Sequence, residues 1–268
     1  EAVPQNIAEV RPTLAVSVPR LFDKVHDRAI TAARALALPG RLVFALALGI
    51  GRKRARAILD QRPVPPMARL LYPLADRLVF SKLREKMGGR IRFFVSGGAP
   101  LAPRSAEFFY AAGIRVLEGY GLTETSPVIS ANTLERTRIG TVGPVIPGVE
   151  VRIAGDGEIL ARGPNVMKGY FRDEEGTREV VKDGWLHTGD IGHLDEDGFL
   201  KITDRKKEML KTSGGKLVAP QPLENVLKAD RFISQAVVVG DRRKFIAALI
   251  VPDFAWVESY ARHKQIPY

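Results

Sequence analysis

The stretch IRFFVSGGAPL, residues 91–101, joins a short apolar run directly to a glycine loop. The run from Ile91 to Val95 is bounded by glycine pairs on both sides, which is typical of an interior strand of a sheet. The loop that follows begins at Ser96 and includes Gly97, Gly98, Ala99 and Pro100. Because open parallel sheets bind ligands at the carboxyl ends of their strands, this loop is a candidate ligand-binding element.

The sequence on both sides of this stretch predicts an α/β fold with a parallel sheet. After the loop, residues 103–112 have helical spacing, residues 114–117 form a second apolar run, and a second glycine loop begins at Glu118. Before it, residues 11–18 predict a buried strand. Prolines and glycines delimit three predicted helices between these strands, at residues 20–38, 41–61 and 67–87.

The pattern changes twice in the second half of the chain. Residues 140–203 contain short alternating segments separated by tight turns, which predicts a small antiparallel β module. From residue 204, a charged segment precedes a predicted helix at 221–228 and two predicted strands, so we expect an incomplete small α+β domain. The predicted domains are therefore residues 1–139 of a large α/β domain, residues 140–203, and residues 204–268 as a mobile C-terminal domain.

Composition excludes several classes of protein. The 268 residues are 45% hydrophobic and 26% charged, as expected of a folded protein. With no cysteine, the chain has neither disulfides nor thiolate ligands, and its four histidines lack metal-ligand spacing. The longest apolar stretch, Leu42–Ile50, is about half of what a spanning helix needs, and no signal peptide is predicted. We expect a cytoplasmic protein.

The net charge of +11 is confined to the first third of the chain. Residues 1–92 carry 18 basic and 7 acidic residues, whereas residues 93–268 carry 23 of each. Nucleic acid, an anionic membrane and phosphorylated small molecules could all bind such a surface. We expect no nucleic-acid partner, because helix-turn-helix, RNP, KH and zinc-finger patterns are absent from the sequence.

Familiar nucleotide-binding and hydrolase motifs are also absent. The Gly214-Gly215-Lys216 segment is not a Walker loop, because Leu210 stands where that motif needs glycine. The sequence has no GxGxxG fingerprint and no GxSxG element with suitable partners.

Four polar segments remain, in a fixed order along the chain. Taken singly, each is more often a turn or a solvated surface than a site. Together they resemble the motif series of the adenylate-forming superfamily, and most closely that of the long-chain fatty-acid–CoA ligases. The segments are SGGAPL (96–101), EGYGLTETSP (118–127), GWLHTGD (184–190) and DRKKEMLKTSGGK (204–216).

The resemblance implies a reaction and roles for individual residues. Such enzymes activate a carboxylate with ATP and Mg²⁺ to an acyl-adenylate, then transfer the acyl group to CoA with release of AMP. It implies that Thr123 binds the α-phosphate, that Glu124 ligates Mg²⁺, and that Asp190 and Arg205 bind ribose and phosphate. The implied catalytic residues are Thr123, Glu124 and Lys211. The implied cofactor-binding residues are Gly97, Gly98, Ala99, Pro100, Glu118, Gly119, Tyr120, Gly121, Thr123, Asp190, Arg205, Gly214 and Gly215.

The same resemblance predicts a conformational step. Lys207 falls at the family hinge, about which the small domain rotates between the two half-reactions. Lys211 and the loop 212–216 would then face the active site and line the route of the CoA pantetheine.

Two family signatures are absent from the sequence: the phosphate loop ending in PKG, and the C-terminal lysine used in adenylation. We therefore expect a portion of a longer enzyme that is inactive by itself. Two alternatives stay open. One is an aryl, medium-chain or acyl-carrier-protein ligase of the same superfamily, and the other is a non-catalytic nucleotide-binding or interaction module.

The long helical segment before SGGAPL is similar to that of the long-chain ligases. Residues 34–62 contain seven basic residues and one acid, beside the apolar Leu42–Ile50. Peripheral contact with an anionic membrane is one interpretation of this segment. The other interpretation is an ordinary helix that packs on the large domain and exposes its arginines to water.

Overall fold

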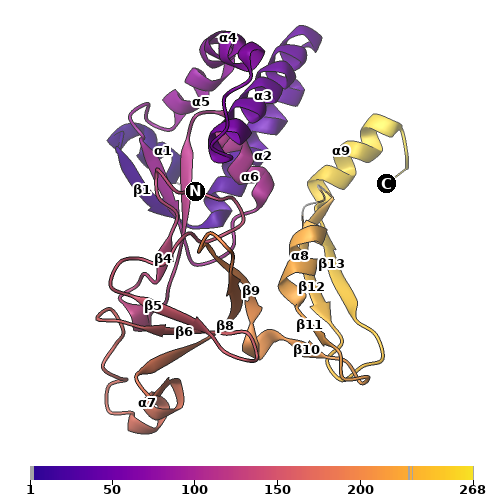
Figure 1. Cartoon of the computed structure of the whole chain (residues 1–268). Coiled ribbons are helices and arrows are strands. Elements are labelled where there is room, and N and C mark those ends of the chain that lie inside the picture. The colour runs from indigo at the N-terminus through magenta and orange to yellow at the C-terminus, as the bar shows by residue number, and fades with distance from the viewer. Residues whose placement is uncertain (1–2, 229, 231, 268) are drawn as a thin grey trace. The chain divides into compact units, whose positions relative to one another are not determined.

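The computed structural model describes residues 3–228, 230 and 232–267 (Figure 1). The chain divides into two compact units. Unit 1 comprises residues 1–148 and 196–200, and unit 2 comprises residues 149–195 and 201–268. The first break after Gly148 lies nine residues beyond the predicted boundary at 139, and the division into three domains stays a prediction.

Unit 1 contains a four-stranded sheet in the order β1-β2-β3-β4. Strands β1 (Leu14–Ser17), β2 (Phe93–Ser96) and β3 (Arg115–Tyr120) are parallel, and β4 (Ser130–Ala131) is antiparallel to β3. The predicted parallel α/β sheet is therefore confirmed.

The helices of unit 1 follow the sequence prediction with two differences, of which one is the unpredicted helix α1 (Val3–Val10). The predicted helix at 67–87 is interrupted by a π-helical turn, η1 (Asp76–Phe80), between α4 (Pro66–Ala75) and α5 (Ser81–Lys86). Pro73, inside α4, lacks the amide hydrogen that a regular helical ladder needs at that point. The remaining helices are α1 (Val3–Val10), α2 (Pro19–Ala35), α3 (Leu38–Leu59) and α6 (Pro103–Ala111).

Aromatic residues form the centre of the unit 1 core. Phe22 of α2 makes edge-to-face contacts with Phe94 of β2 and Phe109 of α6, with ring centroids 5.5 and 5.6 Å apart. All three side chains are fully buried. Because α2 and α6 are held against β2 in this way, the loop that leaves β2 starts from a rigid base.

Unit 2 begins with an antiparallel sheet in the order β5-β6-β8-β7, and β9 also pairs with β8. The predicted antiparallel β module is confirmed. Its elements are β5 (Glu150–Ile153), β6 (Glu158–Arg162), α7 (Glu174–Val180), β7 (Val181–Lys182), β8 (Trp185–Leu194) and β9 (Leu200–Arg205).

The rest of unit 2 contains two small antiparallel pairs, as the α+β prediction requires. These are β10 (Leu210–Lys211) with β11 (Leu217–Val218), and β12 (Ile233–Val239) with β13 (Ala247–Pro252). Helices α8 (Pro220–Lys228) and α9 (Phe254–Lys264) complete it. Of the helices described in the structure, none has the length and apolar character needed to cross a bilayer.

Candidate nucleotide-binding site

The two glycine loops of unit 1 leave neighbouring parallel strands. Ser96, at the end of β2, lies opposite Glu118 of β3 in the strand register. A β-carbon on Gly97 would lie 3.6 Å from the carbonyl oxygen of Gly119. The segments 96–101 and 118–121, which are far apart in the sequence, therefore lie side by side at the carboxyl end of the sheet.

The first loop offers an open backbone surface. Gly98 has a φ of +81°, a conformation that side chains with a β-carbon rarely adopt. No heavy atom lies within 4 Å of the position that its β-carbon would take. Gly98, Ala99 and Pro100 are all exposed. A flat ring could therefore approach this backbone closely.

Glu118 turns its carboxylate inward. Its side chain accepts a hydrogen bond from the Leu101 amide at 3.2 Å, and the residue is 7% exposed. Burial raises the pKa of Glu118 to about 7, against the opposing effect of the Leu101 and Gly140 amides. Glu118 thus links the first loop to β3, a positioning role that its sequence motif did not predict.

A short helical turn holds Thr123 and Glu124 at the end of the second loop. The turn η2 (Thr123–Thr125) is closed by the fully buried Thr125, whose hydroxyl oxygen accepts from the Leu122 amide at 2.9 Å. Thr123 is exposed and Glu124 is half-buried. Thr123 is therefore accessible to a ligand, whereas Thr125 is structural.

Gly121 is required by the path of the chain at this turn. A β-carbon on Gly121 would lie 1.7 Å from the carbonyl oxygen of Pro127, a distance that no side chain can occupy. The second loop can therefore fold back toward β4 only with glycine at this position.

The carboxylate of Glu124 suits Mg²⁺ in its chemistry. Within the part of the chain that the structure describes, no group of three or more carboxylate or histidine side chains could enclose a metal ion. Mg²⁺ is commonly bound by one or two protein carboxylates together with substrate phosphates, so a single carboxylate fits. When bound, such an ion neutralises phosphate charge.

In unit 2, Asp190 lies on β8 with its carboxylate almost fully buried. Arg205, the last residue of β9, places its Nε 3.3 Å from Oδ1 of Asp190, with 61% of the arginine side chain exposed. The two residues that the sequence assigned to ribose and phosphate are therefore neighbours. Asp190 thus offers a buried carboxylate acceptor, and the guanidinium group of Arg205 beside it is exposed to solvent.

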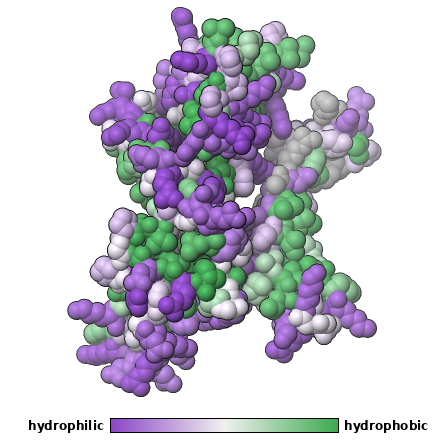
Figure 2. All heavy atoms as spheres, viewed as in Figure 1, coloured by the Kyte–Doolittle hydropathy of each residue, from purple (hydrophilic) through white to green (hydrophobic). Residues whose placement is uncertain are grey.

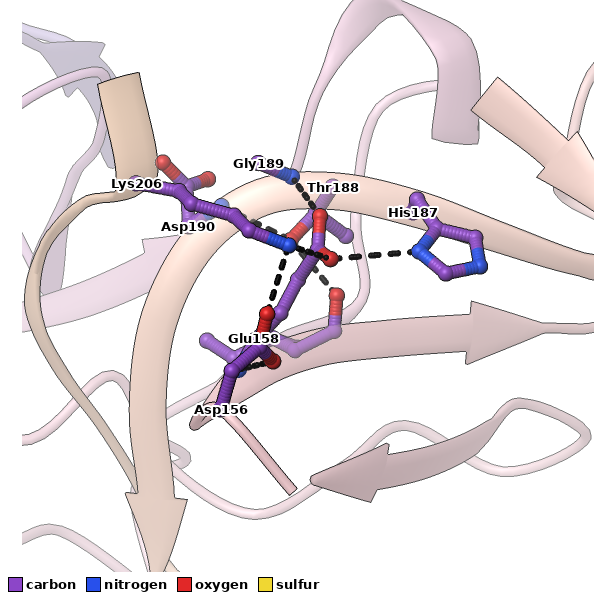
Figure 3. A network of polar contacts seen from close by, with 8 residues as sticks. Asp156, Glu158, His187, Thr188, Gly189, Asp190 and Lys206 are labelled. Atoms are coloured by element: carbon purple, nitrogen blue, oxygen red, sulfur yellow. Dashed lines mark hydrogen bonds and ion pairs between the residues drawn. The ribbon is translucent and has the colours of Figure 1, made fainter. Parts of the chain in front are cut away.

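A polar network around Glu158 fixes the backbone next to Asp190 (Figure 3). Glu158 is 4% exposed and accepts from the Gly189 amide at 3.0 Å. Its Oε2 lies 2.7 Å from Nζ of Lys206 and 3.1 Å from Nδ1 of His187. Burial by itself raises the pKa of Glu158, but the hydrogen bonds from Lys206, His187 and the Gly189 amide, together with the charge of Lys206, lower it overall.

Lys206 connects this network to the predicted hinge. Its Nζ also pairs with Asp156 at 2.7 Å, and its hydrogen bonds to Asp156 and Glu158 raise the pKa of Lys206. Lys207, the next residue, is exposed in the turn η3 (Lys206–Glu208). The residue before the predicted hinge is thus anchored by two carboxylates.

The loop assigned to CoA is a tight turn between β10 and β11. The Thr212 amide donates to the carbonyl oxygen of Lys216 at 2.9 Å, and the Lys216 amide donates to the Thr212 hydroxyl at 3.1 Å. Gly214 and Gly215, at the tip, have no neighbouring atoms where a β-carbon would lie. Lys211 is exposed, and its amide donates to Asp241 at 3.0 Å.

Comparison with known protein families supports the same assignment. The sequence model described as "AMP-binding enzyme" matches residues 1–171. The chain belongs to the AMP-binding enzyme family. A second model, described as the C-terminal domain of AMP-binding enzymes, matches residues 207–265.

The curated relatives of this AMP-binding enzyme chain include fatty-acid ligases. Long-chain-fatty-acid–CoA ligase FadD15 of Mycobacterium tuberculosis is 48% identical over 247 residues, covering 92% of this chain and 41% of that protein. Peroxisomal long chain acyl-CoA synthetase 7 of Arabidopsis thaliana is 38% identical, covering 98% of this chain and 39% of that protein. The chain therefore spans about two fifths of the length of these relatives.

Solved structures of a CoA synthetase share the fold. o-Succinylbenzoate CoA synthetase from Bacillus subtilis, in complex with its acyl-adenylate intermediate, is 29% identical with a TM-score of 0.58. The match covers 70% of this chain and 43% of that one. The AMP complex of the same synthetase matches 97% of this chain and 46% of its own, with a TM-score of 0.61 and 23% identity, and supports the fold alone.

Proposed function

We propose that this chain carries part of the active site of a long-chain fatty-acid–CoA ligase. In the first step, a carboxylate oxygen attacks the α-phosphorus of ATP and pyrophosphate leaves. In the second, the CoA sulfur attacks the acyl carbon and AMP leaves. The observation that carries the proposal is the 48% identity, over 92% of this chain, to a protein named as such a ligase.

The first half-reaction uses residues that offer open backbone and oxygen ligands. We assign the purine to the exposed backbone of Gly97–Pro100 and the α-phosphate to the Thr123 hydroxyl. We assign Mg²⁺ to Glu124 and the ribose hydroxyls to Asp190, with Arg205 beside them. Fixed donors around a phosphate lower the barrier because they need no reorganisation during reaction. The exposure of Thr123 and the burial of Asp190 support these roles.

The second half-reaction uses the segment after β9. We assign the hinge to Lys207, and the passage of pantetheine to Lys211 and the loop with Gly214 and Gly215. The exposure of all four residues supports this assignment.

The direct test is exchange of labelled pyrophosphate into ATP, driven by a panel of acids, with the protein expressed at the full length of its gene. We expect exchange with long-chain acids, and a loss of about 100-fold in Thr123→Val, the cost typical of removing one catalytic donor. Exchange that depends on aryl or medium-chain acids instead would favour the alternative ligases. A protein without exchange that still binds a non-hydrolysable acyl-adenylate by calorimetry would be a non-catalytic module.

The 268-residue chain by itself is predicted to be inactive, because the PKG phosphate loop and the adenylation lysine are absent from its sequence. Detectable acyl-CoA formation by this chain would contradict that prediction.

We also propose peripheral contact with an anionic membrane by a cytoplasmic protein. Leu38, Leu42 and Leu46 of α3 are spaced four residues apart and are 68, 56 and 67% exposed. Figure 2 shows hydrophobic and hydrophilic residues together at the surface over α3 and α4. Sedimentation with anionic vesicles tests this contact: binding should fall with added salt and in Leu42→Ser/Leu46→Ser. Absence of binding at low salt would exclude it.

A further inference from the structure

Unit 1 contains a polar cavity lined by eight arginines. Its volume is about 1050 Å³, and its walls come from α3 and the loop after it, from η1, α5 and α6, and from the loop before β5. Four of the seven basic residues in segment 34–62 line it: Arg52, Arg54, Arg56 and Arg62. Together with Arg84, five of the 18 basic residues in the first third of the chain therefore line one cavity.

The acidic residues of the cavity do not balance this charge. Three carboxylates are paired: Arg56 with Glu107 at 3.2 Å, Arg84 with Asp76 at 2.7 Å, and Arg138 with Asp197 at 2.6 Å. Only two further carboxylates line the cavity, so the lining has a net charge of +3. Within the described residues, five lining arginines have no carboxylate partner: Arg52, Arg54, Arg62, Arg115 and Arg136.

Some of these guanidinium groups are already held in place. The guanidinium of Arg54 lies over the ring of Tyr72, 4.3 Å from its centroid. Arg136 donates to the carbonyl oxygen of Asp197 at 2.8 Å and lies over Phe199. Stacking on a ring leaves the N–H edge of a guanidinium group available, and it reduces the entropy lost when a ligand binds.

One donor in the lining has no acceptor within the part of the chain that the structure describes. The Nε atom of Arg52 is buried and has no hydrogen-bond partner among the described residues. Arg52 as a whole is half-buried, but a buried donor atom without an acceptor is costly. An acceptor oxygen that reached this atom would remove that cost, so the unpaired donor is a second feature, beside the charge count, that favours an anion.

The cavity is separate from the glycine loops. Arg115, in its lining, is the first residue of β3, whereas the second glycine loop begins at Glu118 and continues past Tyr120, the last residue of the strand. From Arg115 to Tyr120 the strand spans about 17 Å at its usual rise per residue. The cavity therefore lies at the amino end of the parallel sheet, and the candidate nucleotide loops lie at the carboxyl end.

We propose that this cavity binds the phosphate groups of a multiply phosphorylated ligand. A guanidinium group can donate two parallel hydrogen bonds to two oxygens of one phosphate. Several guanidinium groups without a carboxylate partner around one cavity therefore favour a ligand with more than one phosphate charge. The volume is that of a small-molecule site. The ligand could be a soluble polyphosphate ester or a phosphorylated lipid headgroup, because both present the same chemistry. The proposal does not depend on the ligase function.

The test is calorimetric titration of the 268-residue chain with two probes, inorganic tripolyphosphate and vesicles that contain phosphatidic acid. We expect saturable binding of at least one probe that weakens with added salt. Binding of tripolyphosphate would assign a soluble ligand, and binding of the vesicles alone would assign a headgroup. The double variant Arg62→Gln/Arg115→Gln should weaken binding about tenfold or more, since each lost charged hydrogen bond is worth at least a factor of ten.

Both substituted residues are exposed and lack a carboxylate partner in the described chain, so the variant should keep its fold. Arg69→Gln on α4 removes an exposed arginine outside the cavity and is the matched control. Arg115→Lys, which keeps the charge but loses the fork, should be intermediate. The proposal is overturned if neither probe binds, or if Arg69→Gln weakens binding as much as the double variant.

Discussion

The backbone amide of Leu101 donates a hydrogen bond to Oε1 of Glu118 at 3.2 Å, and this bond ties the loop after β2 to the neighbouring strand β3. The carboxyl group is almost fully buried, and burial raises its pKa to about 7. The carboxyl group that links the two segments assigned to nucleotide binding therefore ionises near neutral pH.

This pKa predicts a stability that depends on pH. The folded pKa lies above the ordinary value of 4.5, so the folded state holds the proton more tightly than the unfolded state between these two values. The stabilisation is fully present below pH 4.5 and is lost as the pH rises through 7. Glu118→Gln, which is neutral throughout, should lack this dependence. Melting temperatures of the two proteins from pH 5 to 8 test it: a difference between them that does not change with pH would contradict the prediction.

Asp190→Asn should weaken the binding of AMP about tenfold or more. The substitution keeps the shape of the side chain but removes the negative charge that Arg205 and the ribose hydroxyls contact in our assignment. Asp183→Asn is the matched control, since Asp183 is exposed in the same unit. Calorimetry with AMP, on protein expressed at the full length of its gene, gives both affinities. Equal affinities for the two variants would exclude Asp190 from the nucleotide site.

Glu158→Gln should reduce the affinity for AMP, although Glu158 makes no contact with the nucleotide in our assignment. Glu158 is buried and accepts from the Gly189 amide and from Lys206, so a neutral amide in its place weakens both contacts next to Asp190, although Asp156 still pairs with Lys206. We expect a loss of about 1–3 kcal/mol in the free energy of unfolding. Denaturant titration measures that loss, and calorimetry with AMP measures affinity. Unchanged values in both would mean that the network does not position Asp190.

The strands and the glycine loops could be predicted from sequence because they depend on local pattern. The run at 91–95 and the loop at 96–100 are contiguous, and the structure places strand β2 before that loop. The orientation of Glu118 could not be predicted, because it depends on an amide 17 residues away. Glu158 and Lys206 are 48 residues apart, and nothing in the local pattern pairs them.

The sequence prediction missed the helices α1 and α9, of 8 and 11 residues, and several elements that are short or weakly patterned. Helix α7 has seven residues, and each strand of the β10–β11 pair has two. An N-cap signal for α7 was present: the side chain of Asp173 accepts from the Gly176 amide at 2.8 Å. An aspartate followed by two glutamates predicts such a helix start, and this signal could have identified the helix.

Gly121→Ala should destabilise the protein by about 3 kcal/mol or more, because the new methyl group would overlap the Pro127 carbonyl oxygen and the turn would have to move. Gly214→Ala is the matched control. Its β-carbon would meet no atom within 4 Å, so its unfolding midpoint should stay close to that of the unchanged protein. Thermal unfolding compares the two. A stable Gly121→Ala protein would show that the second loop follows a different path.

Lys207→Pro should impair the two half-reactions unequally. Lys206 on one side is fixed by Glu158 and Asp156, and the Lys211 amide on the other side is fixed by Asp241. Rotation between the two half-reactions would then be concentrated in the short segment that includes Lys207. Proline restricts φ and removes an amide donor, whereas Lys207→Ala removes only the side chain and serves as the control. Pyrophosphate exchange measures adenylation, and transfer from preformed acyl-adenylate to CoA measures thioester formation, both with protein of full gene length. We expect Lys207→Ala to retain most of both activities and Lys207→Pro to lose one much more than the other. Equal losses of both in Lys207→Pro would argue against a hinge at this residue.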